Sequence, residues 1–329
     1  IKSFRINGVA VARDKIVYGE NCGSTNRFND IDLGKYLTHG TNTFELALID
    51  YGEWVGLSIN NSYPDTLYVA LISMLILEIT VFLYYFLESQ LHFPQGISIL
   101  IVLGVLIRIL YLSYTPYSGR THDVLDYGGH LDYIKYVANH FQLPNPDGWE
   151  YHQVPLYYIT AALVYKISHH FAFDYLKILQ VLSLAYFTVF LIFGILIFQR
   201  VCKSQWLFLT CTAFLVFWPS GIIHSISIGN DVMYYMLSII GLYFLMEWIA
   251  EKQGKHFYLA VLFVALTVAT KLSGLIWIAI LACFFLLHML KKQHSAAYLK
   301  QTLFLISVLG CALFFGLGRN VIATLHDHK

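Results

Sequence analysis

Ionisable side chains gather in one polar stretch of the sequence, residues 120–158, which is bordered by long apolar runs. Asp126 and His130 are four positions apart, so they share a face if a helix extends that far back. Three further polar residues stand directly before the next apolar run: Glu150, His152 and Gln153. A carboxylate at a membrane surface becomes a better base as it loses water, and imidazoles polarise hydroxyl or phosphate groups. We therefore expect proton-transfer chemistry in this stretch, although a loop histidine can also simply be solvated.

More polar groups lie at the ends of, or inside, later apolar runs. Lys271 falls between two runs, where its ammonium could meet a lipid phosphate or could snorkel to the surface. Asn230 and Asp231 precede another run, where they could contact a substrate or cap a helix. Arg108 and Glu78 lie within runs, so we expect them to pair unless Arg108 lines a cavity. With Arg120, the candidate substrate- or phosphate-binding residues are Arg120, His130, Glu150, His152, Gln153, Asn230, Asp231 and Lys271.

The composition indicates which elements must hold these residues. Of the 329 residues 57% are hydrophobic and 12% charged, whereas soluble domains have about 25% charged residues. This much apolar surface predicts a polytopic α-helical membrane protein, because a soluble domain could not bury it. Apolar runs predict helices at 66–87, 96–114, 154–170, 175–198, 205–224, 230–250, 256–270, 273–290 and 301–318.

The first 62 residues differ from the rest. They are polar, and apolar and polar residues alternate in TFELALIDYGEWVGLSI, which is typical of a strand. INGVAV near the start predicts a hairpin. DLGKYLTHGTNTFELAL resembles the closing strands of galactose-binding-like jelly rolls, so we expect residues 1–62 to be a partial extracytoplasmic β-sandwich. Because the sequence opens at Ile1 and ends soon after an apolar run, we expect a fragment of a longer protein.

Basic residues predict which loops share a side of the membrane. Lys and Arg near 200–203, 252–255 and 291–300 place these three loops in the cytoplasm. Residues 1–62 and the loop 115–153 are then both outside, since two apolar runs separate them. One conflict remains, because two full crossings at 154–170 and 175–198 would put Arg200 outside. Either 154–170 is a short segment that does not cross, which we favour, or the charge rule fails at Arg200.

Charge and cysteine content exclude other classes. A formal net charge of +1 provides no basic field for nucleic acid, so no nucleic-acid partner is expected. The five cysteines are scattered without a C-x-x-C pair, which supports neither a disulfide framework nor a zinc site. No cofactor is indicated; a divalent metal is conceivable, but the residue pattern does not support one.

The polar stretch also carries a helical pattern. Leu131, Ile134, Ala138 and Phe141 form an apolar stripe, which predicts an amphipathic helix suited to lie on the membrane surface. Pro144 and Pro146 are expected to stop it.

Three motifs in this order resemble one enzyme family. DYGGHLDYIKYVANHFQLPNPDGWEYHQVPLYY is similar to the first external loop of the polyprenyl-phosphate-sugar-dependent glycosyltransferases of the GT-C fold, which include protein O-mannosyltransferases and aminoarabinose transferases. SIGNDVMYYMLSIIGLYFL and ATKLSGL resemble two later motifs of that family. Together these motifs span about 96–290. Val154 stands where the family usually has a first proline, and Tyr127 follows Asp126 where a second acid would support a metal site.

The resemblance implies a catalytic domain over 63–329 in the plasma (inner) membrane, with 115–153 as its external catalytic loop. It implies an inverting transfer of a sugar from a polyprenyl-phosphate donor to a protein, glycan or lipid acceptor. Asp126 matches the family's catalytic acidic residue; the alternatives are a helix-capping role for Asp126 and catalysis by Asp123.

Two other classes remain as rivals. A transporter or lipid flippase also keeps ionisable residues at membrane depth, but should show paired broken helices in two related halves, which the sequence does not indicate. A membrane-anchored carbohydrate-binding protein would need only the β-region and one helix, whereas this sequence has many apolar runs.

Overall fold

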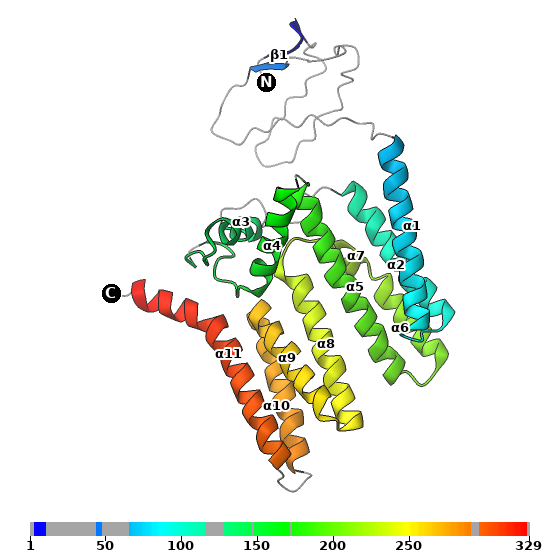
Figure 1. Cartoon of the computed structure of the whole chain (residues 1–329), viewed down its shortest axis with the longest axis vertical. Coiled ribbons are helices and arrows are strands. Elements are labelled where there is room, and N and C mark those ends of the chain that lie inside the picture. Colours follow the sequence, from blue (N-terminus) through cyan, green and yellow to red (C-terminus); the bar gives the residue numbers. More distant parts are fainter. Residues whose placement is uncertain are drawn as a thin grey trace. The chain divides into compact units, whose positions relative to one another are not determined.

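The computed structural model describes residues 3–10, 44–47, 66–115, 128–146, 148–171, 173–290 and 296–327 (Figure 1). The chain divides into two compact units, residues 1–69 and 70–329. Each unit is described separately below.

The first unit contains a small antiparallel sheet. Its strands β1 (Ser3–Ile6), β2 (Val9–Ala10) and β3 (Phe44–Ala47) lie in the order β2-β1-β3. Asn7 and Gly8, both at positive φ, connect β1 to β2. This is the backbone that a two-residue hairpin turn requires, so the predicted hairpin is confirmed. The rest of the expected β-sandwich lies outside the described residues.

The second unit consists of helices, and α1 (Thr66–Ser89) leads into it. The others are α2 (Gln95–Tyr114), α3 (His130–His140), α4 (Leu156–His170), α5 (Tyr175–Val201), α6 (Gln205–Val216), α7 (Pro219–His224), α8 (Asn230–Glu251), α9 (Gly254–Thr270), a 3-10 turn η5 (Leu272–Gly274), α10 (Leu275–Leu290) and α11 (Ala296–Asp327). Each predicted apolar run corresponds to one helix except 205–224, which is two helices; α11 extends beyond the predicted 301–318 at both ends, and a 3-10 turn precedes α10.

Three helices in the described part of the chain are long and apolar enough to cross a bilayer: α2, α5 and α8. Shorter apolar helices, among them α6 and α9, accompany them. The bundle places α2 and α6 beside α5, α5 beside α8, and α8 beside α9, with α10 and α11 packed on α9 (Figure 1). The chain is therefore a mostly helical protein with candidate membrane spans.

The break in the run 205–224 falls at Pro219, which is the first residue of α7. Proline has no N–H and disfavours helical geometry in the residue before it, so α6 ends at Val216. The Val216 carbonyl instead accepts a hydrogen bond of 2.9 Å from Nη1 of Arg108 on α2. A cation at the carboxyl end of a helix also complements the helix dipole.

The expected pairing of Arg108 with Glu78 is wrong. Arg108 is fully buried, bonds the carbonyls of Gly104 and Val216, and stacks 4.8 Å above the ring of Phe187. Glu78 is exposed. Among the described residues the two form no ion pair. Arg108 is thus a buried structural residue that satisfies the carbonyl freed by the break at Pro219.

Helices α3 and α4 lie side by side and run in the same direction. His130 at the start of α3 bonds Tyr158 at the start of α4, and Lys166 near the end of α4 lies 3.7 Å from the ring of Phe141, which caps α3. The sequence predicted an apolar stripe that faces the membrane, but Leu131, Ile134 and Ala138 of this stripe are buried in a core shared with α4. Phe141, the last residue of the stripe, is 80% exposed, and the chain turns there into the left-handed conformation.

α4 packs antiparallel along the first part of α5. Near the start of α4, Thr160 accepts a hydrogen bond of 3.5 Å from the hydroxyl of Tyr186 on α5. Tyr165 on α4 packs on Tyr175, the first residue of α5, and Lys135 of α3 lies over the same ring. Lys177, one turn further, donates to the carbonyls of Leu112 and Thr115 at the end of α2. The opposite end of α5 carries Arg200, which bonds Glu247 near the end of α8. α4 therefore accompanies α5 only from Tyr175 to Tyr186, and that residues 154–170 do not cross the membrane stays a prediction.

Candidate functional site

Four segments that are distant in sequence meet at one end of the helical unit. They are the start of α3 at 128–130, the loop 150–153 before α4, the start of α8 at 229–231, and the end of α9 at 270–271. Hydrogen bonds and ion pairs join them in three groups: His130 with Glu150 and Tyr158, Gln153 with Asn230 and Thr270, and Asp231 with Lys271. We call the residues of these three groups, together with the neighbouring Gly128 and Gly229, the end cluster.

His130 is the most enclosed imidazole of the predicted set. Its Nδ1 lies 2.7 Å from the Tyr158 hydroxyl, and its Nε2 lies 3.8 Å from Oε1 of Glu150. Burial first, and then the Glu150 carboxylate, raise the pKa of Tyr158 well above its ordinary value of 10. Tyr158 therefore stays protonated, and its hydroxyl pairs with Nδ1 while Nε2 faces Glu150. Glu150 can in turn stabilise the imidazolium form.

Glycines allow the backbone to approach this histidine. A Cβ on Gly229 would lie 3.2 Å from Nε2 of His130, so the start of α8 packs against the ring. Gly128 has a φ of +71°, and a Cβ there would lie 2.6 Å from the Cα of Gly148. This close approach lets the Gly128 carbonyl accept a 2.7 Å hydrogen bond from the Glu150 amide. The crossing of these two chain segments fixes the position of Glu150.

Asn230 joins three segments through one amide group. Its Nδ2 donates to Oε1 of Gln153 and to the carbonyl of Thr270, both at 3.2 Å. Asn230 is buried, and a buried amide left without acceptors is costly, so these bonds fix how α8, α9 and the loop before α4 meet. The alternative in which Asn230 caps α8 is not observed, since Gly229 holds that position and no side chain caps the helix.

Asp231 and Lys271 form an ion pair between the start of α8 and the end of α9. The Lys271 side chain is 27% exposed and that of Asp231 is 50% exposed, so the pair is open to solvent on one side. Lys271 therefore does not snorkel alone, because it already has an anionic partner. A partly exposed pair is weak, and an arriving anion can compete for the lysine.

The predicted residues divide into three groups. Six lie in the end cluster: His130, Glu150, Gln153, Asn230, Asp231 and Lys271. His152 is exposed, and its Nε2 lies 3.5 Å from the side-chain nitrogen of Gln153, at the edge of the cluster. Arg120 and Asp126 lie outside the described residues, as does Asp123.

Sequence reasoning missed Tyr158 and the glycines of the end cluster. Tyr158 belongs to the Pro-Leu-Tyr-Tyr run at the start of α4, which the sequence indicated only as an apolar boundary. Its ring stacks on Tyr133 of α3, with centroids 3.7 Å apart, which holds the hydroxyl toward His130. The run of two tyrosines beside polar residues was the available signal.

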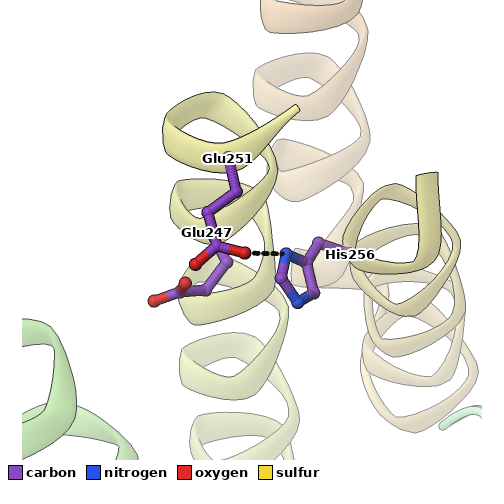
Figure 2. Close-up of side chains that lie close together, drawn as sticks. All are labelled: Glu247, Glu251 and His256. Carbon is purple, nitrogen blue, oxygen red and sulfur yellow. Dashed lines mark ion pairs between the residues drawn. The ribbon is translucent and has the colours of Figure 1, made fainter. Parts of the chain in front are cut away.

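A second cluster of ionisable residues lies at the other end of α8. Figure 2 shows Glu251 of α8 directed at His256 of α9, with Glu247 of α8 beside Glu251. The candidate ligand atoms of these three residues lie within 4.8 Å of one another. Arg200 lies 2.7 Å from Glu247 and 3.8 Å from Glu251, and His256 lies 3.5 Å from Glu251. The guanidinium already supplies the positive charge that a metal ion would bring. We therefore interpret the group as an ion-pair network that joins α5, α8 and α9.

The two clusters are separated by most of the length of α8. Asn230 and Glu247 are 17 residues apart, which corresponds to about 25 Å of helix at 1.5 Å per residue. That length approaches the thickness of a bilayer's hydrocarbon core, about 30 Å. The end cluster and the ion-pair network thus fit opposite surfaces of one membrane.

No family model matches the chain, and no curated protein is significantly similar to it. The family resemblance therefore rests on the three motifs. The residues of these motifs that the structure describes supply most of the end cluster.

The end cluster combines the groups that acid–base chemistry on a phosphorylated substrate requires. A histidine held between a phenol and a carboxylate can bind or polarise a hydroxyl or phosphate oxygen. Lys271 supplies a cation, and Asp231 and Glu150 supply carboxylates. A metal or cofactor site is not indicated among the described residues of this cluster.

Proposed function

We propose that the chain is a glycosyltransferase of the GT-C type, which moves a sugar from a polyprenyl-phosphate donor to an acceptor on the non-cytoplasmic face of the plasma membrane. The observation that carries the proposal is the end cluster. Residues from all three family-like motifs come together there: His130 and Glu150, Asn230 and Asp231, and Lys271.

The proposed reaction is a single displacement. The acceptor hydroxyl attacks the anomeric carbon while the bond from that carbon to the phosphate oxygen breaks, which inverts the configuration. The proton of the hydroxyl passes to the carboxylate of Asp126, and the polyprenyl phosphate leaves with the bonding electrons. Asp126 precedes Gly128 of the end cluster by two positions in the sequence. A positioned base of this kind contributes a factor on the order of 10²–10⁴ to the rate.

The other groups have roles that follow from their charge. Lys271, with Arg120, neutralises the leaving phosphate, and such a charge-assisted contact is strongest where water is scarce. His130, held by Tyr158 and Glu150, polarises a phosphate or sugar oxygen. Gln153 and Asn230 keep the segments in place, and His152 lies at the solvent side.

Lipid extraction of the purified protein, followed by mass spectrometry, tests the donor class. We expect a polyprenyl-phosphate sugar to co-purify with the wild-type protein and to be consumed when acceptor is added. If the protein, reconstituted into vesicles, moves a lipid or solute across the membrane and transfers no sugar, the transporter or flippase alternative replaces this proposal.

A further inference from the structure

Glu78 is a charged residue in the middle of an apolar helix, α1. The only other charged residue of α1 is Glu88, which is next to the end of the helix. Glu78 follows Thr66 by 12 residues and precedes Ser89 by 11, so about 17 Å of helix separates it from either end. A glutamate side chain is too short to reach a membrane surface over that distance. A membrane-spanning α1, as the sequence predicts, therefore carries this carboxyl group in the hydrocarbon core.

The Glu78 side chain faces away from the helical bundle. Leu83 and Leu87 of α1 pack in a core with residues of α2, and Leu87 is fully buried. Leu87 follows Glu78 by nine residues, which at about 100° per residue places the two on opposite sides of the helix. Helix α1 stands at the edge of the bundle (Figure 1). Glu78 is accordingly exposed, and within the part of the chain that the structure describes it has no hydrogen-bond or ion-pair partner.

Glu78 belongs to a row of exposed side chains with the spacing of a coiled coil. The row consists of Met74, Glu78, Val81 and Tyr85, which follow one another at intervals of four, three and four residues. Met74, Val81 and Tyr85 are 58%, 46% and 62% exposed. Side chains at these intervals line one side of a helix, and two parallel helices pack along such a row. We call the four residues the α1 seam.

A polar residue within such a row calls for a polar partner. An ionisable group in hydrocarbon is costly and is normally paired with another polar group. In coiled coils a single polar residue in the packed row fixes the register and the number of helices. The α1 seam, with one carboxyl group among apolar and aromatic side chains, has this composition. It therefore indicates a helix–helix contact and not only contact with lipid.

A second copy of the chain fits the α1 seam. Two copies in one membrane have the same orientation, and a two-fold axis along the membrane normal brings each residue of the seam opposite its own equivalent. A carboxyl group can pair with another, because the protonated form donates a hydrogen bond and both forms accept one. A cation from the second copy is not at hand. Arg108, the basic residue furthest from the ends of the candidate spans, is buried against Phe187.

We propose that the protein forms a two-fold symmetric dimer in the membrane, in which two α1 seams pack in parallel and the two Glu78 carboxyl groups hydrogen-bond to each other. Hydrogen bonds between polar side chains help to hold membrane helices together, since lipid provides no hydrophobic driving force between them. The dimer gives Glu78 the partner that Arg108 does not provide. The inference depends on the membrane location of α1 and not on sugar transfer.

Disulfide cross-linking in membranes tests the geometry of the dimer in the full chain. The five native cysteines are replaced by serine, and one cysteine is introduced as Val81→Cys, three residues after Glu78 in the α1 seam. Leu103→Cys on α2 is the matched control, because Leu103 is 44% exposed and Val81 is 46% exposed. We expect oxidation with copper phenanthroline to join two copies through Val81→Cys and not through Leu103→Cys. Equal cross-linking of both variants, or none through Val81→Cys, would overturn the proposal.

The dimerisation equilibrium tests the role of the carboxyl group. Single-molecule photobleaching counts the copies in phosphatidylcholine vesicles over a range of protein-to-lipid ratios, with a dye on Asn139→Cys in the cysteine-free chain. Glu78→Leu should raise the ratio at which half of the chains are dimers by about fivefold or more, because the hydrogen bonds between the helices are lost. Glu78→Gln should dimerise like the wild type, since an amide also donates and accepts. Glu88→Leu, the same substitution near the end of the helix, should have little effect.

Two results of this second measurement would overturn the proposal. One is an equilibrium that Glu78→Leu leaves unchanged while the variant remains folded by thermal unfolding; leucine at a lipid-facing position should not impair folding. The other is a wild-type protein that stays monomeric at every ratio. A monomeric wild type whose Val81→Cys variant cross-links to a different protein would assign the α1 seam to a partner that carries a cation.

Discussion

Lys271 and Asp231 show how a residue predicted to bind an anion is held before the anion arrives. The pair orients the ammonium at the end of α9, and its exposure keeps the attraction modest. A phosphate dianion that approaches from solvent brings more charge than one carboxylate. It can therefore draw Lys271 away at small cost, whereas a fully buried pair could not be opened so easily.

At the residue scale we predict that Lys271→Ala weakens donor binding. Loss of a charge-assisted contact worth about 1.5–3 kcal/mol corresponds to a rise in donor KM of about tenfold or more. Stability should change little, because the pair is partly exposed. Steady-state kinetics with varied donor, together with thermal unfolding, measures both effects.

Lys252→Ala is the matched control, since Lys252 is an exposed lysine at the opposite end of α8. It should leave the donor KM at the wild-type value. An unchanged KM in Lys271→Ala itself would assign Lys271 to holding α8 and α9 together.

Asn230 gives a second prediction at this scale. Asn230→Leu removes both hydrogen bonds and leaves the Gln153 and Thr270 oxygens without this donor. We expect a loss of about 1–3 kcal/mol in the free energy of unfolding, because buried acceptors lose a partner. Chemical denaturation in detergent measures it, and a loss below 0.5 kcal/mol, roughly the scale of a neutral surface substitution, would count against the role of Asn230.

The residue types of the end cluster could be predicted from the sequence, but their pairing could not. His130 and Glu150 belong to the polar stretch 120–158, and Asn230, Asp231 and Lys271 stand at the ends of apolar runs, so the sequence indicates all five. That Lys271 meets Asp231, and that Arg108 meets a carbonyl instead of Glu78, depends on which helices lie side by side. A single sequence contains no direct signal for this.

At the scale of elements, the approach of α2 and α6 depends on one glycine. A Cβ on Gly104 would lie 2.2 Å from Cγ1 of Val216, so only glycine permits this contact and the bond from Arg108 to the end of α6. Small residues that allow helices to approach closely are typical of packing in membranes.

We predict that Gly104→Ala destabilises the protein by about 1–3 kcal/mol, as overpacking does. Helix propensity alone would make alanine more stable than glycine at this position, so a loss of stability shows that the added Cβ collides with Val216. The double variant Gly104→Ala/Val216→Ala should recover most of the loss, because it removes the atom that collides. Thermal unfolding in detergent distinguishes these cases.

Gly310→Ala is the control for Gly104→Ala. Gly310 lies in α11, and a Cβ there would meet nothing within 4 Å. It should be neutral or slightly stabilising. Equal destabilisation by both alanines would mean that α2 and α6 do not approach as described.

Hydropathy predicted the helices well because length and apolar content decide whether a segment is helical in a membrane protein. Hydropathy did not predict where a helix is interrupted by a residue such as proline. Pro219 divides the run 205–224 into two helices, although the run is apolar throughout. The partial β-sandwich in residues 1–62 stays a prediction beyond its three described strands.

At the scale of the whole molecule, the two charged clusters define the ends of the bundle. The end cluster is predicted to lie outside and the ion-pair network of Arg200, Glu247 and Glu251, with Lys252 and Lys255 nearby, in the cytoplasm. We predict that a membrane-impermeant thiol reagent labels Asn139→Cys on intact cells and labels Lys255→Cys only after permeabilisation. Labelling of both positions on intact cells would contradict this topology.

The central claim is that this end of the molecule transfers a sugar with Asp126 as the base. Asparagine keeps the size and most hydrogen bonds of the aspartate but cannot accept the proton. Asp126→Asn should therefore lower turnover by a factor on the order of 10²–10⁴ while donor binding survives. Asp123→Asn, three positions earlier, should be much milder.

The measurement is the rate of sugar transfer from a polyprenyl-phosphate donor in reconstituted vesicles, for the wild type and these two variants side by side. The account predicts transfer by the wild type and by Asp123→Asn, and almost none by Asp126→Asn. Transfer by Asp126→Asn at near the wild-type rate would contradict it.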